Sequence, residues 1–557
     1  MTAALDTHLL VGAFVDELGR CGVRDACTSP GSRCAPLVLA FARDGALNAH
    51  SHVDERCAGF FALGLAKASG RPVAVTCTSG TAAANLLPAV IEADEARLPL
   101  IVLTADRPPE LRDVGAGQAI DQLKLYGDAV RWFFEVGTHA ASERALRWVR
   151  GLACRAVAEA TGERPGPVHL NWPLREPLAP GGPVEIPAGR AGRQPWVARE
   201  RPPQETAALG DLVPDGARAV IVAGRSERPL VAVAEVARAC GYPLLADPLS
   251  GARRGPAAVA HYDLLLRDPG IGGTLRPEAV IRVGDLPTSK PLRAWLAELA
   301  DVPQVAIDPA GAWQDPDGVL WRSVRADPAR LVPGAAAPPG WLEAWREADA
   351  RIAQRVAAVI KNAGLSELGV ARALGELLPA QATMLVAASM PVRLIESVWP
   401  ARDDPPRVLA NRGANGIDGT VSTAFGVKAG SAAGPVAALL GDLALAHDAG
   451  GLLAASRLGL AVTFVLIDNG GGGIFDHLPV AAESDVYEAH IATPTGIDFE
   501  RLAGAYSLDY ARPAAPERLG ELLAGALAAE RSTLLHVAVE RAAGVELQRR
   551  LVAAALS

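Results

Sequence analysis

Short hydrophobic runs alternate with helical hydrophobic periodicity through the first third of the chain. Residues 73–76 and 100–104 are apolar runs rich in β-branched residues, and each ends in a polar turn. Such runs, separated by amphipathic stretches of helical length, predict βαβ units and a largely parallel sheet. Residues 173–203 are rich in Pro, Gly and Arg and lack this periodicity, so we expect them to form a linker.

The same alternation returns twice along the chain, on either side of a Pro- and Gly-rich break at 334–341. Strands are expected at 219–223, 243–246, 279–283 and 304–307, and then at 384–387, 436–440, 460–467 and 534–539. A helix is expected over roughly 447–456. The pattern therefore predicts an α/β fold of three doubly wound, largely parallel-sheet domains, 1–180, 181–340 and 341–557.

Composition narrows the class of protein. The formal net charge of -8 gives no support for a nucleic-acid partner. Seven cysteines without any CxxC pair indicate reduced, buried thiols in a cytoplasmic protein. The N-terminus has no basic leader, and the longest apolar run is far below the ~20 residues of a membrane span. We therefore expect no membrane insertion.

Several common cofactor motifs are missing from the sequence. No G-x-G-x-x-G and no Gly-Lys pair occur, so the sequence carries neither a dinucleotide fingerprint nor a P-loop. The middle block is accordingly expected to hold no FAD or NAD. H-E-x-x-H and G-x-S-x-G are also missing, which weakly disfavours zincin and α/β-hydrolase chemistry.

Polar residues and glycines follow two predicted strands of the third block. Asp442 follows the strand at 436–440, and Asp468, Asn469 and four glycines follow the strand at 460–467. Open α/β sheets bind ligands at the carboxyl ends of their strands. A carboxylate, an amide oxygen and a backbone carbonyl suit Mg²⁺, and bare glycine backbone can approach a diphosphate. The residues predict a metal–diphosphate site, with an incidental pair of turns as the alternative.

Gly441-Asp442, followed by Asn469, resembles the metal–diphosphate motif of thiamine diphosphate (ThDP) enzymes. The resemblance implies ThDP with Mg²⁺ or Mn²⁺ as cofactors. It also implies a set of metal ligands and a set of apolar residues that line the cofactor pocket, although core packing explains the apolar residues equally well. The metal ligands are Asp442, Asn469 and the carbonyl of Gly471, and the apolar residues are Ile474, Phe475 and Leu478.

Glu55 stands at the head of a predicted helix in the first block. An acidic residue there is favoured by the helix dipole alone, and the small residues Ala58, Gly59, Ala62 and Gly64 permit close packing. Within the ThDP resemblance, Glu55 matches the glutamate that acts on the cofactor's aminopyrimidine ring and promotes loss of its C2 proton. The later stretch "TCTSGTAAANL" matches the same domain type, which implies that Thr78 and Gly80 contact the cofactor.

Four further motifs narrow the resemblance: "TSPGSR" (28–33), "TADRPPELRDVGAGQAIDQ" (104–122), "SMPVR" (389–393) and "NRGANGIDG" (411–419). They resemble the ThDP enzymes of menaquinone biosynthesis, which decarboxylate 2-oxoglutarate and add the remainder to isochorismate. This implies a transferase that is a homodimer or homotetramer with active sites at subunit interfaces. It also implies catalytic roles for Ser32, Arg33, Gln118 and Ser389, and a place beneath the bent cofactor for Ile417.

Basic residues recur in the predicted site. Each of the two substrates carries two carboxylates, and a site that binds them needs cations to pair with these charges. We assign Arg393 and Arg412 mainly to the carboxylates of 2-oxoglutarate. We assign Arg33, Arg107 and Lys290 mainly to isochorismate.

Two positions depart from the family pattern. Gly117 precedes Gln118 where the family typically has Asn, and Pro291 follows Lys290 where the family has Arg. Whether Arg293 substitutes for that arginine stays open. An acetolactate-synthase-like enzyme or a simple 2-oxo-acid decarboxylase is the first alternative, disfavoured because no His-His pair occurs. A catalytically inactive binding protein on the same fold is the second.

Overall fold

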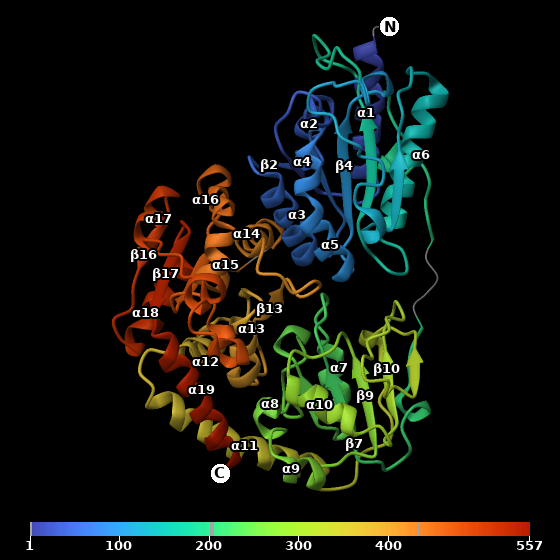
Figure 1. Cartoon of the computed structure of the whole chain (residues 1–557). Coiled ribbons are helices and arrows are strands. Elements are labelled where there is room, and N and C mark those ends of the chain that lie inside the picture. Colours follow the sequence, from blue (N-terminus) through green and yellow to red (C-terminus); the bar gives the residue numbers. More distant parts are fainter. Residues whose placement is uncertain (1–2, 201–204, 432–433) are drawn as a thin grey trace. The chain divides into compact units, whose positions relative to one another are not determined.

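The computed structural model describes residues 3–200, 205–431 and 434–557, and it contains three parallel sheets (Figure 1). Neighbouring strands run parallel throughout. The predicted α/β class with three doubly wound, largely parallel sheets is confirmed. The chain divides into two compact units. Unit 1 comprises Met1–Arg201, Asn411–Ala432 and His447–Ala461, and unit 2 comprises Pro202–Ala410, Ala433–Ala446 and Val462–Ser557.

The first sheet lies in unit 1 and has the strand order β2-β1-β3-β4-β6-β5. Its strands are β1 (Asp25–Thr28), β2 (Asn48–Ser51), β3 (Val73–Cys77), β4 (Leu100–Asp106), β5 (Trp132–Glu135) and β6 (Val168–Pro173). The helices of unit 1 are α1 (Ala3–Arg20), α2 (Ala35–Arg43), α3 (Glu55–Ser69), α4 (Thr81–Asn85), α5 (Leu87–Glu95), α6 (Glu143–Ala160), α14 (Thr420–Gly430) and α16 (Leu453–Leu458).

The pleat of the first sheet divides its side chains between two layers of helices. Ala74, Leu103 and Leu170 share a hydrophobic core with residues of α1, α2 and α6. Successive side chains of a strand point to opposite faces, so the intervening residues face the other way. Helix α3 contacts β1, β3, β4 and α5. The sheet therefore positions the helix that begins at Glu55.

Unit 2 contains the other two sheets. The middle sheet has the order β11-β10-β9-β7-β8, and the third has the order β13-β12-β14-β15-β17-β16. Their strands are β7 (Ala219–Ala223), β8 (Leu244–Ala246), β9 (Ala279–Val283), β10 (Gln304–Ile307), β11 (Arg322–Val324), β12 (Thr383–Val386), β13 (Arg407–Ala410), β14 (Val436–Gly441), β15 (Thr463–Asp468), β16 (Asp509–Ala511) and β17 (Thr533–Ala538). The helices are α7 (Val231–Cys240), α8 (Tyr262–Leu265), α9 (Pro269–Thr274), α10 (Lys290–Glu298), α11 (Trp341–Lys361), α12 (Glu367–Leu377), α13 (Met390–Val398), α15 (Asp442–His447), α17 (Phe499–Ala505), α18 (Pro516–Ala528) and α19 (Arg541–Leu556).

One hydrophobic core joins the middle and third sheets. Val220 and Val280 of the middle sheet belong to it, and so do Leu439 and Val465 of the third. Residues of α10, α11, α12, α13 and α19 fill the same core. Because the two sheets share buried side chains, they belong to one compact unit.

Helices α3 and α14 touch through their backbones. A Cβ atom at Gly64 of α3 would lie 2.2 Å from the carbonyl oxygen of Thr423, and one at Gly426 of α14 would lie 2.0 Å from that of Phe61. The close packing predicted from the small residues of α3 is confirmed. It also gives a physical reason why residues 411–431, which we predicted within the third domain, cluster with unit 1.

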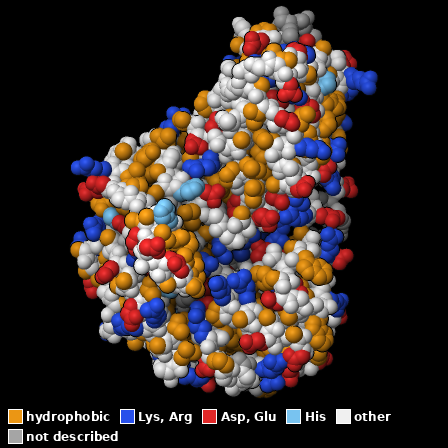
Figure 2. Space-filling view, viewed as in Figure 1, with side chains coloured by type: hydrophobic (Ala, Val, Ile, Leu, Met, Phe, Trp, Pro, Cys, Tyr) orange, Lys and Arg blue, Asp and Glu red, His pale blue; other side chains and the backbone are white. Residues whose placement is uncertain are grey.

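The helical stretch expected over roughly 447–456 extends over 449–458, and a separate short helix precedes it. Helix α15 begins at Asp442 itself and ends at His447, and a 3₁₀ turn (Ala449–Leu452) precedes α16. Asp442 thus lies in the first turn of a helix, where the positive end of the helix dipole favours a carboxylate. None of the described helices is long and apolar enough to cross a membrane. Acidic, basic and hydrophobic side chains are intermixed over the face shown in Figure 2.

Candidate active site

Two loops of unit 1 meet at the switch point of the first sheet. β1 and β3 are neighbours, but the chain first passes from β1 to β2 on the other side. Ligands of open α/β sheets bind at the carboxyl ends of strands at such a point. Residues 29–33 follow β1 and residues 78–80 follow β3. A Cβ atom at Gly31 would lie 2.3 Å from the Cβ of Thr78, so the two loops touch. Thr78 and Gly80 are buried there, whereas Ser32 is exposed.

Arg107, Ser79 and Gln118 form a hydrogen-bonded cluster at the end of β3. Arg107 Nη1 donates to the Ser79 hydroxyl at 2.7 Å, and Nη2 donates to the Gly117 carbonyl at 2.7 Å. The Ser79 hydroxyl donates to the Gln118 carbonyl at 3.0 Å, and the Gln118 amide donates back to the Ser79 carbonyl at 3.1 Å. A Cβ atom at Gly117 would meet no described atom within 4 Å. Packing within the described chain therefore does not require glycine at position 117, where the family typically has Asn.

Gln122 fixes the same loops, although the sequence analysis did not select it. Its Oε1 accepts from the Gly80 backbone N–H at 2.9 Å, and its Nε2 donates to the Ala105 carbonyl at 3.1 Å and to Asn171 Oδ1 at 3.0 Å. A buried amide that uses both its donor and its acceptor holds the 78–80 loop against β4 and β6. Its place at the end of the 104–122 motif was the only sequence signal for it.

Arg33 is buried, and its two terminal nitrogens bind protein. Nη1 donates to the Leu174 carbonyl at 2.7 Å, and Nη2 lies 3.1 Å from Glu176 Oε1. Its Nε is buried without a hydrogen-bond partner in the described parts of the chain. Burial and, to a lesser extent, the charge of Arg33 lower the pKa of Arg107. The charge of Arg33 therefore acts on Arg107, and both residues lie in loops that follow strands of the first sheet.

Glu55 is half-buried in the first turn of α3. The cap of this helix is Asp54, whose carboxylate accepts from the backbone N–H groups of Arg56 and Cys57 at 2.8 and 3.2 Å. Burial and the nearby Glu55 carboxylate raise the pKa of Cys34 to about 11, and a hydrogen bond with Thr78 opposes this shift. Glu55 thus heads a helix that follows β2 and contacts β1 and β3, and its charge acts on Cys34, with which Thr78 also forms a hydrogen bond.

The loop 411–419 carries Ile417 and Arg412, and Glu92 holds it on unit 1. Glu92 lies in α5 and is 3% exposed. Its two carboxylate oxygens accept from the backbone N–H groups of Gly413 and Ala414 at 2.9 and 2.7 Å. Ile417 is half-buried, and its carbonyl accepts from the Thr420 hydroxyl at 2.9 Å. Because Glu92 is 321 residues from Gly413 in the chain, no local sequence pattern could have found it.

Asp442 and Asn469 lie at the carboxyl ends of adjacent strands in unit 2. β14 and β15 pair in parallel with Gly441 opposite Ile467. Asp442 Oδ2 and Asn469 Oδ1 are both buried without a hydrogen-bond partner among the described residues. Burial and the neighbouring charge of Asp468 raise the pKa of Asp442 to about 6. Two buried, unpaired oxygens of this kind fit a divalent cation with oxygen ligands.

The protein's own packing already requires most of the glycines that follow Asn469. A Cβ atom at Gly471 would lie 2.4 Å from the Ala492 carbonyl oxygen, and one at Gly472 would lie 2.7 Å from the Phe475 ring. A Cβ atom at Gly473 would lie 2.5 Å from Asn469 Nδ2. Gly471 also has a φ of 130°, which side-chain-bearing residues rarely adopt. Its carbonyl accepts from the Gly473 N–H at 2.9 Å and retains a second lone pair for a metal.

Further side chains define the surroundings of this loop. His536 Nε2 lies 2.8 Å from Asp468 Oδ2, and Tyr510 binds the other ring nitrogen of His536 at 2.8 Å. This pairing occupies Asp468, the residue directly before Asn469. Ile474 and Phe475 are half-buried, and Leu478 is 42% exposed.

Ser389 follows β12, which neighbours β14 at the switch point of the third sheet. Its φ of 68° is unusual for a residue with a side chain, and Arg393 Nη1 donates to its carbonyl at 2.5 Å. Burial and, to a lesser extent, the charge of Arg293 lower the pKa of Arg393. Within the residues that the structure describes, Arg293 Nε is itself buried without a hydrogen-bond partner. Lys290, one turn earlier in α10, is exposed.

The switch point of the middle sheet is filled by the chain itself. Arg225 follows β7 and Asp285 follows β9, and Arg225 Nε donates to Asp285 Oδ2 at 2.9 Å. A Cβ atom at Gly224 would lie 1.5 Å from the Asp285 carbonyl oxygen. Protein backbone and this ion pair therefore occupy the position where open sheets bind nucleotides.

Three family models match the chain in order. They are the N-terminal TPP binding domain of thiamine pyrophosphate enzymes (residues 10–125), the middle domain (190–386) and the C-terminal TPP binding domain (393–537). A protein of Geobacillus thermodenitrificans, 2-succinyl-5-enolpyruvyl-6-hydroxy-3-cyclohexene-1-carboxylate synthase, is 42% identical over 99% of this chain and 96% of its own length. The synthase of Bacillus velezensis is 40% identical over 99% of this chain and 98% of its own length. The synthase of Halobacterium salinarum is 43% identical over 96% of this chain and 96% of its own length. The chain belongs to this synthase family of thiamine pyrophosphate enzymes.

Membership of the synthase family confirms the resemblance drawn from the motifs of the sequence. It also confirms the expectation of a ThDP-dependent enzyme, because both cofactor-binding domain models match. Glu55 and Thr78 lie within the N-terminal match, and Ile417, Asp442 and Asn469 lie within the C-terminal match. The roles assigned to single residues, and the domain limits, stay predictions.

Proposed function

We propose that this chain decarboxylates 2-oxoglutarate and adds the remaining four-carbon unit to isochorismate, as a cytoplasmic transferase of menaquinone biosynthesis. Its cofactors are ThDP and Mg²⁺ or Mn²⁺. The observation that carries the cofactor assignment is the pair of buried oxygens of Asp442 and Asn469, at the ends of adjacent strands, that have no hydrogen-bond partner among the described residues. The names of relatives at 40–43% identity support the substrates.

Asp442, Asn469 and the Gly471 carbonyl hold the metal in this proposal, and through it the diphosphate. Bound ThDP supplies a carbon nucleophile that can attack a 2-oxo acid and retain the electron pair when CO₂ leaves. Glu55 holds a proton at the aminopyrimidine ring. Ile417, on the loop fixed by Glu92, supports the bent form of the cofactor.

The substrates carry several carboxylates, and the basic residues divide between them. Arg393 and Arg412 bind mainly 2-oxoglutarate, while Arg107 and Lys290 bind mainly isochorismate. Arg33 contributes to isochorismate binding through its charge, because its terminal nitrogens already bind Leu174 and Glu176. Arg293 supplies the guanidinium missing beside Lys290, since its charge acts on Arg393 and its Nε is buried with no hydrogen-bond partner among the described residues. Two desolvated cations in proximity favour a bound dianion between them.

We further propose that the active site forms between two copies of the chain. Support comes from exposed hydrophobic residues around the unit 1 half of the site. Val53, two residues before Glu55, is 56% exposed, and Val114 and Leu123, in the loop that carries Gln118, are 67% and 47% exposed. A second copy of the chain would cover such residues.

Incubation with 2-oxoglutarate, isochorismate, ThDP and Mg²⁺, followed by mass analysis of the product, tests the reaction. Omission of any one component should abolish the product. Pyruvate in place of 2-oxoglutarate should give no product, and a product from pyruvate alone would favour the acetolactate-synthase-like alternative. Failure to bind ThDP under any metal condition would favour a catalytically inactive protein.

Mixed dimers test the shared site. Glu55→Gln and Asp442→Ala subunits, each inactive alone, should form mixed dimers in which one site receives both native residues. Co-expression with two affinity tags and sequential purification isolates these dimers. Recovered activity supports a site shared between subunits, and a dimer that stays inactive contradicts it.

A further inference from the structure

Asn469 has a partner on a distant helix that fixes the orientation of its amide. Asn469 Nδ2 donates to Glu367 Oε1 at 2.8 Å, across a separation of 102 residues. Glu367 is the first residue of α12, follows the N-cap Ser366, and is 6% exposed. A Cβ atom at Gly544 of α19 would lie 3.5 Å from the Glu367 carboxyl carbon, so α19 packs against the same carboxylate that binds Asn469.

The chemistry of this contact decides which way the amide points. An amide can present either its nitrogen or its oxygen to a neighbour. A carboxylate oxygen can only accept, so Asn469 must turn its nitrogen towards Glu367. The amide oxygen is then directed to the opposite side, where it is buried without a partner among the described residues. That oxygen is the one that a metal ion needs.

We propose that Glu367 is a positioning residue for the metal site: it holds the Asn469 amide so that Oδ1 faces the cation. This inference rests on the proposed function, because it presumes a metal bound at Asp442 and Asn469. Groups that orient a metal ligand typically account for about 10- to 100-fold in metal affinity. Removal of the Glu367 carboxylate should leave Asn469 free to rotate and to present its nitrogen to the metal.

The test measures the affinity for Mg²⁺ rather than turnover. Each protein is titrated with Mg²⁺ at saturating ThDP, and tryptophan fluorescence reports cofactor binding. Glu367→Ala should raise the Mg²⁺ Kd by about 10- to 100-fold, while the final amplitude at saturating metal equals that of the wild type. Glu367→Gln retains an acceptor oxygen and should recover most of the affinity. Glu376→Ala, in the same helix but with a 51% exposed side chain, is the matched control.

The outcomes separate this inference from the proposed function. An unchanged Kd in Glu367→Ala, or equal damage in Glu367→Gln, overturns the positioning role. A lower amplitude that excess Mg²⁺ does not restore means that Glu367 only supports the fold, and this also overturns the inference. A wild-type protein that binds neither Mg²⁺ nor ThDP overturns the proposed function first and the inference with it.

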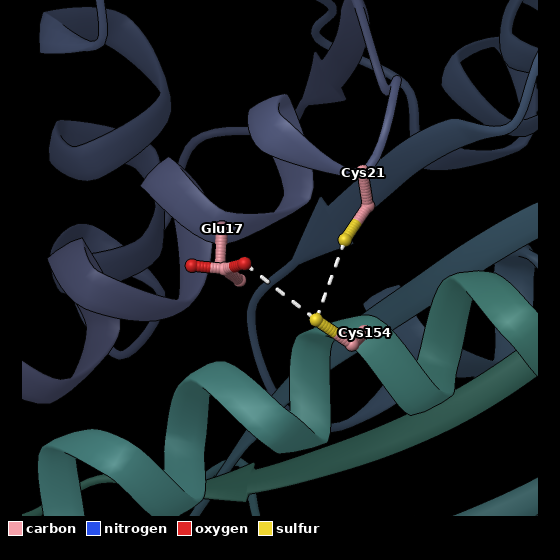
Figure 3. Close-up of side chains that lie close together, drawn as sticks. All are labelled: Glu17, Cys21 and Cys154. Atoms are coloured by element: carbon pink, nitrogen blue, oxygen red, sulfur yellow. Dashed lines mark hydrogen bonds between the residues drawn. The ribbon is translucent and has the colours of Figure 1, made fainter. Parts of the chain in front are cut away.

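A second observation, independent of the active site, concerns two thiols in unit 1. Cys21 directly follows α1, Cys154 lies in α6, and their Sγ atoms are 3.5 Å apart (Figure 3). Cys154 Sγ also lies 3.5 Å from Glu17 Oε1 and accepts from the Val197 N–H at 3.4 Å. Cys154 is buried and Cys21 is half-buried, so a reagent from solvent reaches Cys21 first.

Glu17 favours thiol chemistry over metal binding in this cluster. The three side chains are close enough to hold a metal ion. However, the Glu17 carboxylate already accepts from Arg150 at 2.8 Å and from the Trp196 N–H at 2.5 Å. Its charge is therefore compensated. Its Oε1 lies 3.5 Å from Cys154 Sγ and accepts a hydrogen bond from that thiol.

We infer that Cys21 and Cys154 form a reversible disulfide when a small-molecule disulfide oxidises them. Cys21 loses its proton to solvent and its sulfur attacks the reagent, which gives a mixed disulfide at Cys21 and releases one half of the reagent as a thiolate that takes up a proton. Cys154 passes its proton towards Glu17, and its sulfur attacks Cys21 Sγ. The Cys21–reagent bond breaks and the second reagent thiol leaves with a proton. The sulfur atoms need to approach from 3.5 Å to about 2.05 Å, and the new bond ties α1 to α6.

Oxidised glutathione tests this inference. In the treated wild type, two of the seven thiols should no longer react with an alkylating reagent. The mass should be lower by two hydrogens, and digestion should give a peptide that joins Cys21 to Cys154. Cys154→Ser should instead retain one glutathione on Cys21, and Cys21→Ser should retain none at Cys154. Cys240→Ser, in unit 2, is the control and should behave as the wild type. Seven free thiols in the treated wild type, or a different cross-linked pair, overturn the inference.

Discussion

Arg107 Nη1 lies 2.7 Å from the hydroxyl oxygen of Ser79 and joins the loops that follow β4 and β3. The contact holds the guanidinium at the switch point of the first sheet while leaving further N–H groups for a ligand. Preorganised charge of this kind acts on a substrate without reorganisation when the substrate arrives. Arg393 is held in a similar way on unit 2, by the carbonyl of Ser389.

Arg107→Ala and Arg393→Ala should damage different halves of the reaction. Arg107→Ala should spare CO₂ release from 2-oxoglutarate, measured with an artificial electron acceptor, and should raise the KM for isochorismate. Arg393→Ala should damage CO₂ release itself. Loss of a charge-assisted pair in a partly desolvated site costs roughly 1.5–3 kcal/mol, or about 10- to 150-fold. Arg144→Ala, on the exposed surface of α6, is the control. If both variants lose CO₂ release and isochorismate binding to the same extent, the two arginines act together on both substrates.

Glu55→Gln should slow proton exchange at C2 of bound ThDP. Glutamine keeps the shape of the side chain and still accepts a hydrogen bond, but it cannot supply an acidic proton. The loss should be roughly 10²-fold or more, the scale of general acid–base contributions. Deuterium exchange followed by NMR after acid quench measures it. Glu143→Gln, in the first turn of α6 with a 94% exposed side chain, should exchange as the wild type does. Unchanged exchange in Glu55→Gln would remove Glu55 from the mechanism.

Asp442→Ala should abolish ThDP binding at millimolar Mg²⁺ because the metal loses its one carboxylate ligand. The pairing of β14 with β15 and the hydrophobic core of unit 2 do not depend on this carboxylate, so the fold should persist although the backbone N–H of Gly471 loses an acceptor. Calorimetric titration of ThDP with and without Mg²⁺ measures the loss. Asp485→Ala, at an exposed position, is the control. Tight, metal-dependent binding by Asp442→Ala would place the metal elsewhere.

Ile417→Ala should lower turnover more than it lowers affinity for ThDP. An apolar side chain beneath the cofactor imposes its bent form, whereas the diphosphate and metal contacts supply most of the binding. The loop backbone should stay in place, because Glu92 still accepts from Gly413 and Ala414. Parallel measurement of kcat and of the ThDP Kd separates the two effects. A large change in Kd with an unchanged kcat would assign Ile417 to loop packing instead.

His169 should make unit 1 less stable in mild acid. Its Nε2 lies 2.7 Å from Thr104 Oγ1, and its Nδ1 is buried with no hydrogen-bond partner among residues 3–200, 205–431 and 434–557. Burial lowers its pKa from 6.5 to about 3. The unfolded chain therefore binds a proton below about pH 6.5 that the folded chain does not, so stability falls as pH falls through that value. By about pH 5 the loss should be about 2 kcal/mol.

Calorimetric melting at neutral pH and at about pH 5 checks this prediction. His169→Gln keeps a donor to Thr104 and removes the titration, so its melting temperature should fall less between the two conditions, by roughly 4–8 °C. His490→Gln, at an exposed position, should follow the wild type. An identical pH dependence in His169→Gln would show that other groups control acid stability.

The sequence determined the fold class and the elements that carry the site. The expected strands at 219–223, 279–283 and 304–307 match β7, β9 and β10 residue for residue, because buried parallel strands are short continuous runs of apolar residues. The head of α3 at Glu55 and the strand end before Asp442 were also predicted correctly. The strand before Asn469 begins at Thr463 rather than at 460, because the pattern does not distinguish the apolar residues before a strand from the strand itself.

The tertiary structure decided how the site residues are held. Glu92 fixes the loop of Ile417, and Glu367 turns the amide of Asn469, each from a position more than one hundred residues away. It also decided that α14 belongs to the same compact unit as α3, through the backbone contact at Gly64. Hydrophobic periodicity reports which face of an element is buried, but not which distant element covers it. A single buried carboxylate within reach of two N–H groups leaves no periodic trace in the chain, so only the folded arrangement could reveal it.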